Sequence, residues 1–258
     1  MRKLRSPILL SASLVLWLSG ASCLLGQNLL DEQGRKTGPW KVDYPNGKTL
    51  YEATFKDGRP VGLMVRYYEN GAVRARMKFD PFVDRSFTTL YYKNGKSAAE
   101  GWYEGKAKDS VWTYFSEFDG SVRIREPYVN GMLHGRVQSY YPEGHVSEEV
   151  FWVQNNKKGS WKQFYKDGSL RLDGSYDKDM LNGLYQVYYA DSTIKVSGTY
   201  VDNLSHGIWS YYNEEGEELY TIEFQSGRAV DQAKYLEIMQ DTLKKFELTA
   251  EPDHIQHL

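Results

Sequence analysis

The chain has little of the chemistry that most enzymes use. Its 258 residues include one cysteine and five histidines. A single cysteine forms neither an intrachain disulfide nor a cysteine-rich metal site, so no disulfide bond within the chain stabilises the fold. The sequence also has no phosphate-binding glycine loop, no dinucleotide glycine pattern and no Gly-x-Ser-x-Gly nucleophile motif. We therefore expect a non-enzymatic protein with no catalytic residues, no cofactor and no bound metal.

Strong net charge and long apolar runs are missing as well. The formal net charge is −2, and removal of the first 26 residues would delete three positive charges and leave the chain more acidic. A mildly acidic chain binds nucleic acid poorly, because the phosphate backbone attracts basic surfaces. The most apolar stretch, residues 7–18, is too short to span a bilayer.

Residues 1–26 have the order of an export signal. Basic residues Arg2, Lys3 and Arg5 precede the apolar stretch, and small residues follow at positions 19–22. We expect a signal peptide and an exported protein that is periplasmic, outer-membrane-associated or secreted. Cys23 permits a second interpretation, in which the segment before it is a degenerate lipobox and Cys23 carries a lipid anchor.

What the chain does have is an aromatic residue that returns at steps of 24 residues, with one step of 25. This recurrent aromatic is Phe55, Phe79, Tyr103, Tyr128, Trp152, Tyr176, Tyr200 or Phe224. A period in the low twenties holds one small supersecondary unit, which is too short to bury a core alone and must stack on its neighbours. The spacing predicts a repeat domain over residues 38–227.

Each repeat has the signals of a β-hairpin. The opening residues are Gly38, Gly62, Ser86, Ser110, Gly135, Gly159, Gly183 and Gly207. Two positions later a tryptophan is common, at Trp40, Trp112, Trp161 and Trp209. A pair of aromatic residues usually follows, such as Tyr67-Tyr68, Tyr114-Phe115 and Tyr211-Tyr212. A turn dipeptide of the Asn-Gly or Asp-Gly type then separates two apolar-aromatic runs, which is the strongest local signal for a hairpin.

We predict an all-β fold in which about eight hairpins form one elongated antiparallel sheet of about sixteen strands. The second strand of each repeat alternates between two faces, as expected for a half-buried antiparallel strand. Small residues such as Gly101 and Gly198, two before the recurrent aromatic, leave room for a ring of the next hairpin. The alternative is a small four-bladed propeller built from pairs of repeats. Odd and even repeats show no alternation, which favours the ribbon.

The segments outside the repeats are short. We assign residues 27–37 to a linker and residues 251–258 to a disordered tail. Residues 228–250 have apolar side chains at helical spacing, namely Val230, Ala233, Leu236, Met239, Leu243 and Phe246. We expect this amphipathic helix to cap the last hairpin, as terminal repeats need a cover. Membrane binding is the alternative, but acidic residues offset the lysines of this segment.

The decapeptide at residues 159–168, Gly-Ser-Trp-Lys-Gln-Phe-Tyr-Lys-Asp-Gly, resembles the bacterial variant of the MORN repeat (membrane occupation and recognition nexus). The resemblance implies consecutive hairpins in an elongated sheet that serves protein interaction or lies near a membrane, without catalysis. Some bacterial relatives carry the name of an antitoxin component of toxin–antitoxin systems, a role that fits badly with an export signal. Thr88 stands where tryptophan is usual, and the fourth repeat has an extra residue before Gly120. We expect the middle of the array to bend or bulge.

Two functional hypotheses follow. In the first, the chain is a scaffold for an unknown protein partner or for self-association. In the second, it binds a glycan or the cell envelope, because aromatic hairpin repeats also resemble choline- and glucan-binding modules. The four tryptophans discriminate between them: packed rings leave no platform for a sugar, whereas an open row of rings would provide one.

Overall fold

The computed structural model describes residues 27–249, and for residues 242–249 it describes the backbone alone. The predicted signal peptide, the lipidation of Cys23 and the predicted tail lie outside the described residues. Within that part of the chain, no helix is long and apolar enough to cross a membrane.

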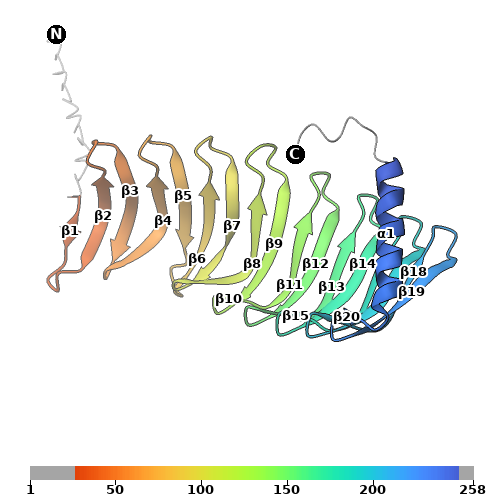
Figure 1. Cartoon of the computed structure of the whole chain (residues 1–258). Helices are drawn as coiled ribbons and strands as arrows, with labels where there is room; N and C mark the ends of the chain where they lie inside the picture. The colour runs from red at the N-terminus through yellow and green to blue at the C-terminus, as the bar shows by residue number, and fades with distance from the viewer. Residues whose placement is uncertain (1–26, 250–258) are drawn as a thin grey trace, which may run out of the picture.

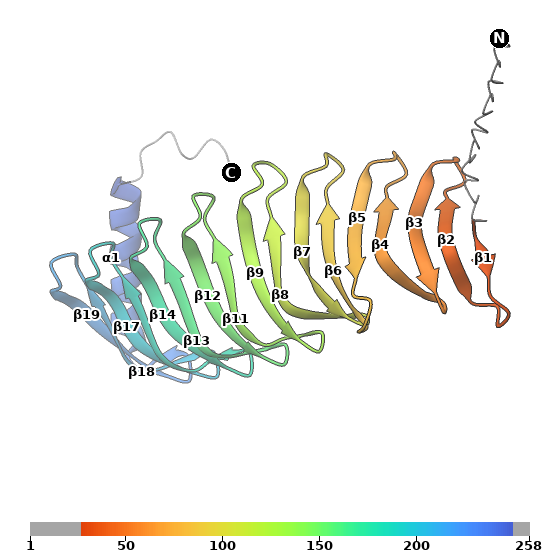
Figure 2. The same ribbon diagram turned by 180° about the vertical axis from the view of Figure 1, so that it is seen from behind.

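The structure is one antiparallel sheet of 20 strands with a helix at the C-terminal end. The sheet is a single curved layer, and the repeats follow one another along it from β1 at one end to β19 at the other (Figures 1 and 2). The two ends of the ribbon lie far apart, so the propeller alternative is wrong and the elongated sheet is confirmed. The physical reason is that each hairpin pairs only with the hairpins before and after it in the chain.

The eight hairpins are formed by sixteen strands. They are β2 (Lys36–Asp43) with β3 (Thr49–Lys56), β4 (Arg59–Tyr67) with β5 (Val73–Phe79), β6 (Arg85–Tyr91) with β7 (Ser97–Glu104), β8 (Ala107–Phe115) with β9 (Val122–Val129), β11 (Gly135–Tyr140) with β12 (Val146–Val153), β13 (Asn156–Phe164) with β14 (Leu170–Asp177), β16 (Gly183–Tyr188) with β17 (Ile194–Val201), and β18 (Leu204–Tyr212) with β19 (Glu218–Gln225). Four strands of two residues complete the sheet: β1 (Leu29–Leu30), β10 (Met132–Leu133), β15 (Met180–Leu181) and β20 (Arg228–Ala229).

All eight hairpins share one register. In every repeat the opening residue pairs with the recurrent aromatic, from Gly38 with Phe55 to Gly207 with Phe224. Six of the eight opening residues are glycines, and all six have positive φ. A backbone in that region strains most other residues, so the conformation explains why glycine returns there. The predicted repeat is therefore confirmed strand by strand.

The core lies along one face of the sheet, where a row of aromatic rings packs together with small and aliphatic side chains such as Ala99 and Ile222. Trp112 is fully buried and Trp209 is 5% exposed. A Cβ atom placed on Gly198 would lie 2.2 Å from the Trp209 ring, and one on Gly101 would lie 2.5 Å from the Trp112 ring. Both tryptophans belong to the hairpin after their glycine. The predicted contact between a glycine and a ring of the next hairpin is thus present.

The turns that lead from one repeat to the next also bond back to the sheet. In seven repeats, a turn residue with positive φ donates its N–H to a backbone carbonyl at the start of the same repeat. In the first repeat Gly58 donates to the carbonyl of Lys36, and in the last Gly227 donates to that of Ser205. The second repeat is the exception, because its turn is longer and leaves the side chain of Phe82 92% exposed.

The expected linker at residues 27–37 is part of the sheet. Leu29 and Leu30 pair with β2. The side chain of Asn28 accepts a hydrogen bond from the N–H of Lys41 at 2.8 Å and donates one to its carbonyl at 2.9 Å. Asn28 thereby occupies backbone groups that would otherwise form an open strand edge, and such edges promote aggregation.

The C-terminal helix α1 (Gln232–Thr249) begins beside the last hairpin, where the Tyr235 ring packs edge-on against Phe224 at 6.2 Å. The half-buried side chains are those of Tyr235, Ile238 and Met239. The predicted apolar stripe is wrong for Val230 and Leu236, which are 57% and 56% exposed, and Ala233 is exposed too. Val230 precedes the helix and donates its N–H to β19, so it does not set the helical spacing. The side chains of Leu243 and Phe246 lie outside the described residues.

Candidate functional site

Neighbouring hairpins are joined by a ladder of tyrosines. The residue six positions after each opening residue, here called the clasp tyrosine, donates a hydrogen bond from its hydroxyl to a backbone carbonyl of the next repeat. The bonds are Tyr44 to Tyr67, Tyr68 to Tyr91, Tyr92 to Phe115, Tyr141 to Phe164, Tyr165 to Tyr188 and Tyr189 to Tyr212, with lengths from 2.7 to 2.9 Å. Six of the seven junctions between repeats have this bond.

The junction between the fourth and fifth repeats lacks the clasp. Ser116 stands at the clasp position, and its hydroxyl oxygen accepts a hydrogen bond from the N–H of Phe118 within its own turn. Among the described residues, no side chain donates to the carbonyl of Tyr140, which is the acceptor position of this junction. The fifth repeat has Val137 two positions after its opening residue, but this feature is not unique, because the second and third repeats also lack a ring there, with Met64 and Thr88. The missing clasp is what distinguishes this junction from the other six.

Sequence reasoning missed this break because it treated all the aromatic pairs as equivalent. Counted from the opening residue, Tyr114-Phe115 and Tyr211-Tyr212 lie one position earlier than the other pairs. In the fourth and eighth repeats the clasp position is consequently Ser116 or Asn213. The eighth repeat has no successor to clasp. The signal was present in the spacing, but the role of the second tyrosine is visible only when the next hairpin is in place.

A hollow of about 750 Å³ lies beside Ser116. Its lining includes Tyr92, Tyr114, Phe118, Arg123 and Ile124. The comparable hollow in the second repeat, walled by the clasp residues Tyr44 and Tyr68, measures about 390 Å³. The larger hollow lies where serine replaces the clasp tyrosine, and it also extends over Lys108, Glu126 and Tyr128, which have no counterpart in the smaller one. We refer to this space as the clasp hollow.

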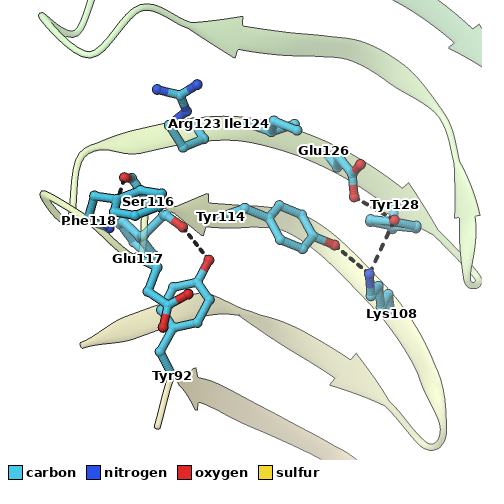
Figure 3. A pocket seen from close by; sticks show the side chains of 11 residues that line it. Tyr92, Lys108, Tyr114, Ser116, Glu117, Phe118, Arg123, Ile124, Glu126 and Tyr128 are labelled. Atoms are coloured by element: carbon cyan, nitrogen blue, oxygen red, sulfur yellow. Dashed lines mark hydrogen bonds between the residues drawn. The ribbon is translucent and has the colours of Figure 1, made fainter. Parts of the chain in front are cut away.

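Further along the same face, a lysine sits among aromatic rings (Figure 3). Lys108 Nζ donates hydrogen bonds to the hydroxyls of Tyr114 and Tyr128, and lies 4.9 Å from the ring centre of Trp112. The hydroxyl of Tyr128 in turn donates to Glu126 at 2.7 Å. Lys36 and Lys157 lie over rings in the same way in the first and sixth repeats. Lysines of the chain thus occupy cation–π positions that a choline-type ligand would need.

Burial and the neighbouring carboxylate affect the two phenols of this cluster. Burial, with the hydrogen bond to Glu126, raises the pKa of Tyr128 to about 12. Burial also raises the pKa of Tyr114, and Glu126 adds to the effect. Both hydroxyls therefore stay protonated near neutral pH, which suits them to hydrogen bonding and not to nucleophilic attack.

The predicted repeat-defining aromatics lie where their register places them, in the row that joins the hairpins. Trp112 and Trp209 are buried. Trp40 and Trp161 are half-buried, and their indole N–H groups donate to the carbonyl of Leu29 at 3.1 Å and to the carboxylate of Glu148 at 2.9 Å. Two of the four tryptophans therefore present no ring face to a sugar, and the other two form no regular open row with them.

Side chains of the types that bind metals do not cluster in the described part of the chain. No three His, Cys, Asp or Glu side chains there are placed to hold a metal ion. His134 is exposed between β10 and β11, where its N–H donates to the carbonyl of Pro127 at 3.0 Å, and His206 lies within β18. His254 and His257 lie outside the described residues.

Comparison with known families agrees with this repeat structure. The family described as MORN repeat variant matches residues 36–57, 133–154 and 157–178. These three segments are the first, fifth and sixth hairpins, and the fourth hairpin with its altered clasp is not among them. No curated protein matches the chain in sequence. MORN repeats are in general a non-catalytic type that serves protein or membrane interaction, and the chain contains repeats of this kind.

Proposed function

We propose that the chain is an exported, non-enzymatic scaffold that binds another protein along its ribbon. The observation that carries this proposal is a row of exposed apolar side chains at one register position. The residue directly after the opening residue is exposed in Leu63 (55%), Val111 (50%), Leu184 (57%) and Ile208 (66%). Side chains alternate along a strand, so this row faces away from the buried aromatic row. Four of the eight repeats have such a residue, and exposed apolar side chains that share one face are typical of an interaction site.

The chemistry of the row favours a protein over a glycan. Leucine, isoleucine and valine offer aliphatic surface, whereas sugar recognition uses exposed aromatic rings. Binding to a glycan or to the cell envelope stays an alternative. A glycan array probed with the exported chain tests it, and specific capture of a glycan would favour that alternative over the scaffold.

Export is proposed from the basic, apolar and small-residue order of residues 1–26. Expression of the full chain in a Gram-negative host, followed by fractionation, is expected to place the protein outside the cytoplasm. Retention in the cytoplasm would contradict export and would reopen the antitoxin interpretation.

The scaffold is tested by crosslinking in the native cell envelope and by light scattering of the purified protein. Leu184→Lys and Ile208→Lys are expected to abolish the crosslinked product and to leave the thermal midpoint nearly unchanged, because both side chains are exposed. Ser160→Lys is the matched control, since Ser160 is an exposed residue at the same register position of the sixth repeat. The scaffold would be refuted if the unaltered chain showed no crosslinked partner and no self-association.

A further inference from the structure

We propose that the clasp hollow beside Ser116 receives a tyrosine side chain of a partner protein. The incoming ring would take the position that the clasp tyrosine of this chain occupies at the other junctions. The identity of the donor as a protein rests on the proposed scaffold function. The ring site itself rests on the geometry of the fourth repeat.

Among the described residues, the carbonyl of Tyr140 lacks the tyrosine hydroxyl that the equivalent carbonyl accepts at the other six junctions. On one side of the hollow, Tyr92 donates to the carbonyl of Phe115 at 2.8 Å. At the junction between the fifth and sixth repeats, Tyr141 donates to the carbonyl of Phe164, also at 2.8 Å. Between these two bonds the carbonyl of Tyr140 has no hydroxyl to accept from among the described residues. Tyr140 does not itself line the hollow, but the residue before it, Ser139, pairs with Ile124, which does. A phenol that enters beside Ser116 can therefore supply the missing donor.

Arg123 stands beside a serine, whereas two of its counterparts in other repeats contact a clasp ring. In the second repeat the guanidinium of Arg74 lies 5.8 Å from the centre of the Tyr68 clasp ring. In the seventh repeat Lys195 lies 5.1 Å from the Tyr189 clasp ring. Arg123 holds the corresponding place in the fourth repeat and lines the hollow, where Ser116 offers no ring. An aromatic ring bound there gains a cation–π contact.

The hollow has room for a ring and an apolar rim. Its volume of about 750 Å³ includes the space beside Ser116 and the space over Lys108 and Tyr128. Ile124 and Tyr114 line it with apolar surface, and Phe118 stands at its edge with 91% of its side chain exposed. Tyrosine is among the residues most enriched at the energetic centres of protein interfaces. Phe118 would be covered when a partner segment lies over the rim.

The chemistry selects tyrosine over other side chains. Phenylalanine fills the ring position but brings no hydroxyl to the carbonyl of Tyr140. A carboxylate is disfavoured, because the carbonyl of Tyr140 is an acceptor and the acidic residues Glu117 and Glu126 also line the hollow. A phenol satisfies the apolar walls, the cation and the acceptor at once.

The test uses single amino acids with blocked termini and the isotopically labelled chain. N-acetyltyrosinamide is expected to shift the amide resonances of Ser116, Ile124 and Tyr140. N-acetylphenylalaninamide is expected to bind roughly fivefold more weakly, since one neutral hydrogen bond contributes about that factor. N-acetylalaninamide is expected to cause no shift there. Absence of any shift at the hollow with the tyrosine compound would overturn the proposal.

Ser116→Tyr supplies the chain's own clasp and is expected to abolish the shifts, whereas Ser116→Ala leaves the hollow open and is expected to keep them. Arg123→Gln is a second variant that does not depend on how the Ser116 variants fold, and it is expected to weaken binding severalfold. Binding to Ser116→Tyr as tight as to the unaltered chain, or to Arg123→Gln without any loss, would refute the assignment.

Failure of the site and failure of the scaffold are separable. If the unaltered chain crosslinks to a partner and Ser116→Tyr crosslinks to it equally well, the scaffold stands and the hollow is not a partner site. If the tyrosine compound binds at the hollow while no partner or self-association is found, the ring site is supported and the scaffold is overturned.

Discussion

The hydroxyl of Tyr68 lies 2.7 Å from the backbone carbonyl of Tyr91 and joins two successive hairpins. The same bond, which joins two residues 23 positions apart in the chain, recurs at six of the seven junctions along the ribbon. In a one-layer sheet each hairpin contacts only its neighbours, so stability is close to a sum of repeat and junction contributions. Each clasp is therefore a local contribution that a single substitution can measure.

Tyr68→Phe keeps the ring and removes the clasp bond. We expect it to lower the free energy of unfolding by about 1 kcal/mol, the usual net contribution of one hydrogen bond. Urea unfolding followed by tryptophan fluorescence measures the change. Tyr67→Phe is the matched control, because its hydroxyl makes a longer bond of 3.3 Å to an exposed carboxylate, that of Glu52. Equal losses in the two variants would contradict the role of the clasp.

Gly198→Ala introduces a methyl group where the Trp209 ring already lies. The added Cβ would be 2.2 Å from the ring, so either the ring or the backbone has to shift. We expect the free energy of unfolding to fall by about 1 to 3 kcal/mol, as for other overpacked cores. Gly174→Ala is the control, because its Cβ would meet the nearest ring at 3.3 Å. Urea unfolding of both variants should show the larger loss for Gly198→Ala, and the reverse order would refute the interlock.

Asn203→Ala tests the turns that join the repeats. Asn203 has φ 67°, and its side-chain oxygen accepts the N–H of Leu181 at 2.7 Å. Alanine loses this bond and is strained at positive φ, which together lower the free energy of unfolding by about 2 kcal/mol. Asn203→Gly loses only the bond and is expected to lose about 1 kcal/mol. Thermal and urea unfolding distinguish the two, and a glycine variant no better than the alanine variant would argue against backbone strain.

The pKa of Tyr128 makes stability depend on alkaline pH. Burial and the hydrogen bond to Glu126 raise the pKa from 10.0 to about 12 in the folded chain. The neutral phenol is thus favoured by folding, and its contribution is fully present below pH 10. It is lost as the pH rises from 10 toward about 12, because the unfolded chain releases this proton first. Urea unfolding across this range should show a fall in stability that is shallower in Tyr128→Phe, and identical slopes would contradict the assignment.

The junction without a clasp should open more easily than the others. Native-state hydrogen exchange reports the free energy of local opening for each amide. We expect amides of β11 that bond to β9 to exchange faster than the equivalent amides at the β3–β4 and β17–β18 junctions. Ser116→Tyr should slow that exchange, and uniform exchange rates at all junctions would argue against a weak fourth junction.

The repeat frame was predictable because it depends on local chemistry. The step between Phe55 and Phe79, the turn dipeptides and the opening glycines each depend on residues within one hairpin, and all eight hairpins have the register they predict. The orientation of α1 was not predictable in this way. Val230 fits the helical spacing in the sequence, but it lies before the helix and its backbone bonds to β19.

By itself, the sequence determined that eight hairpins of common register stack into a ribbon, because each turn and each alternation of side chains is encoded within about two dozen neighbouring residues. Only the tertiary structure decided what the second tyrosine of a pair does, since its acceptor lies 23 residues away on another hairpin. The clasp hollow has the same origin: Ser116 is an ordinary turn residue until the next hairpin is placed beside it. Contacts between repeats depend on how separate hairpins stack, and no local pattern specifies that arrangement.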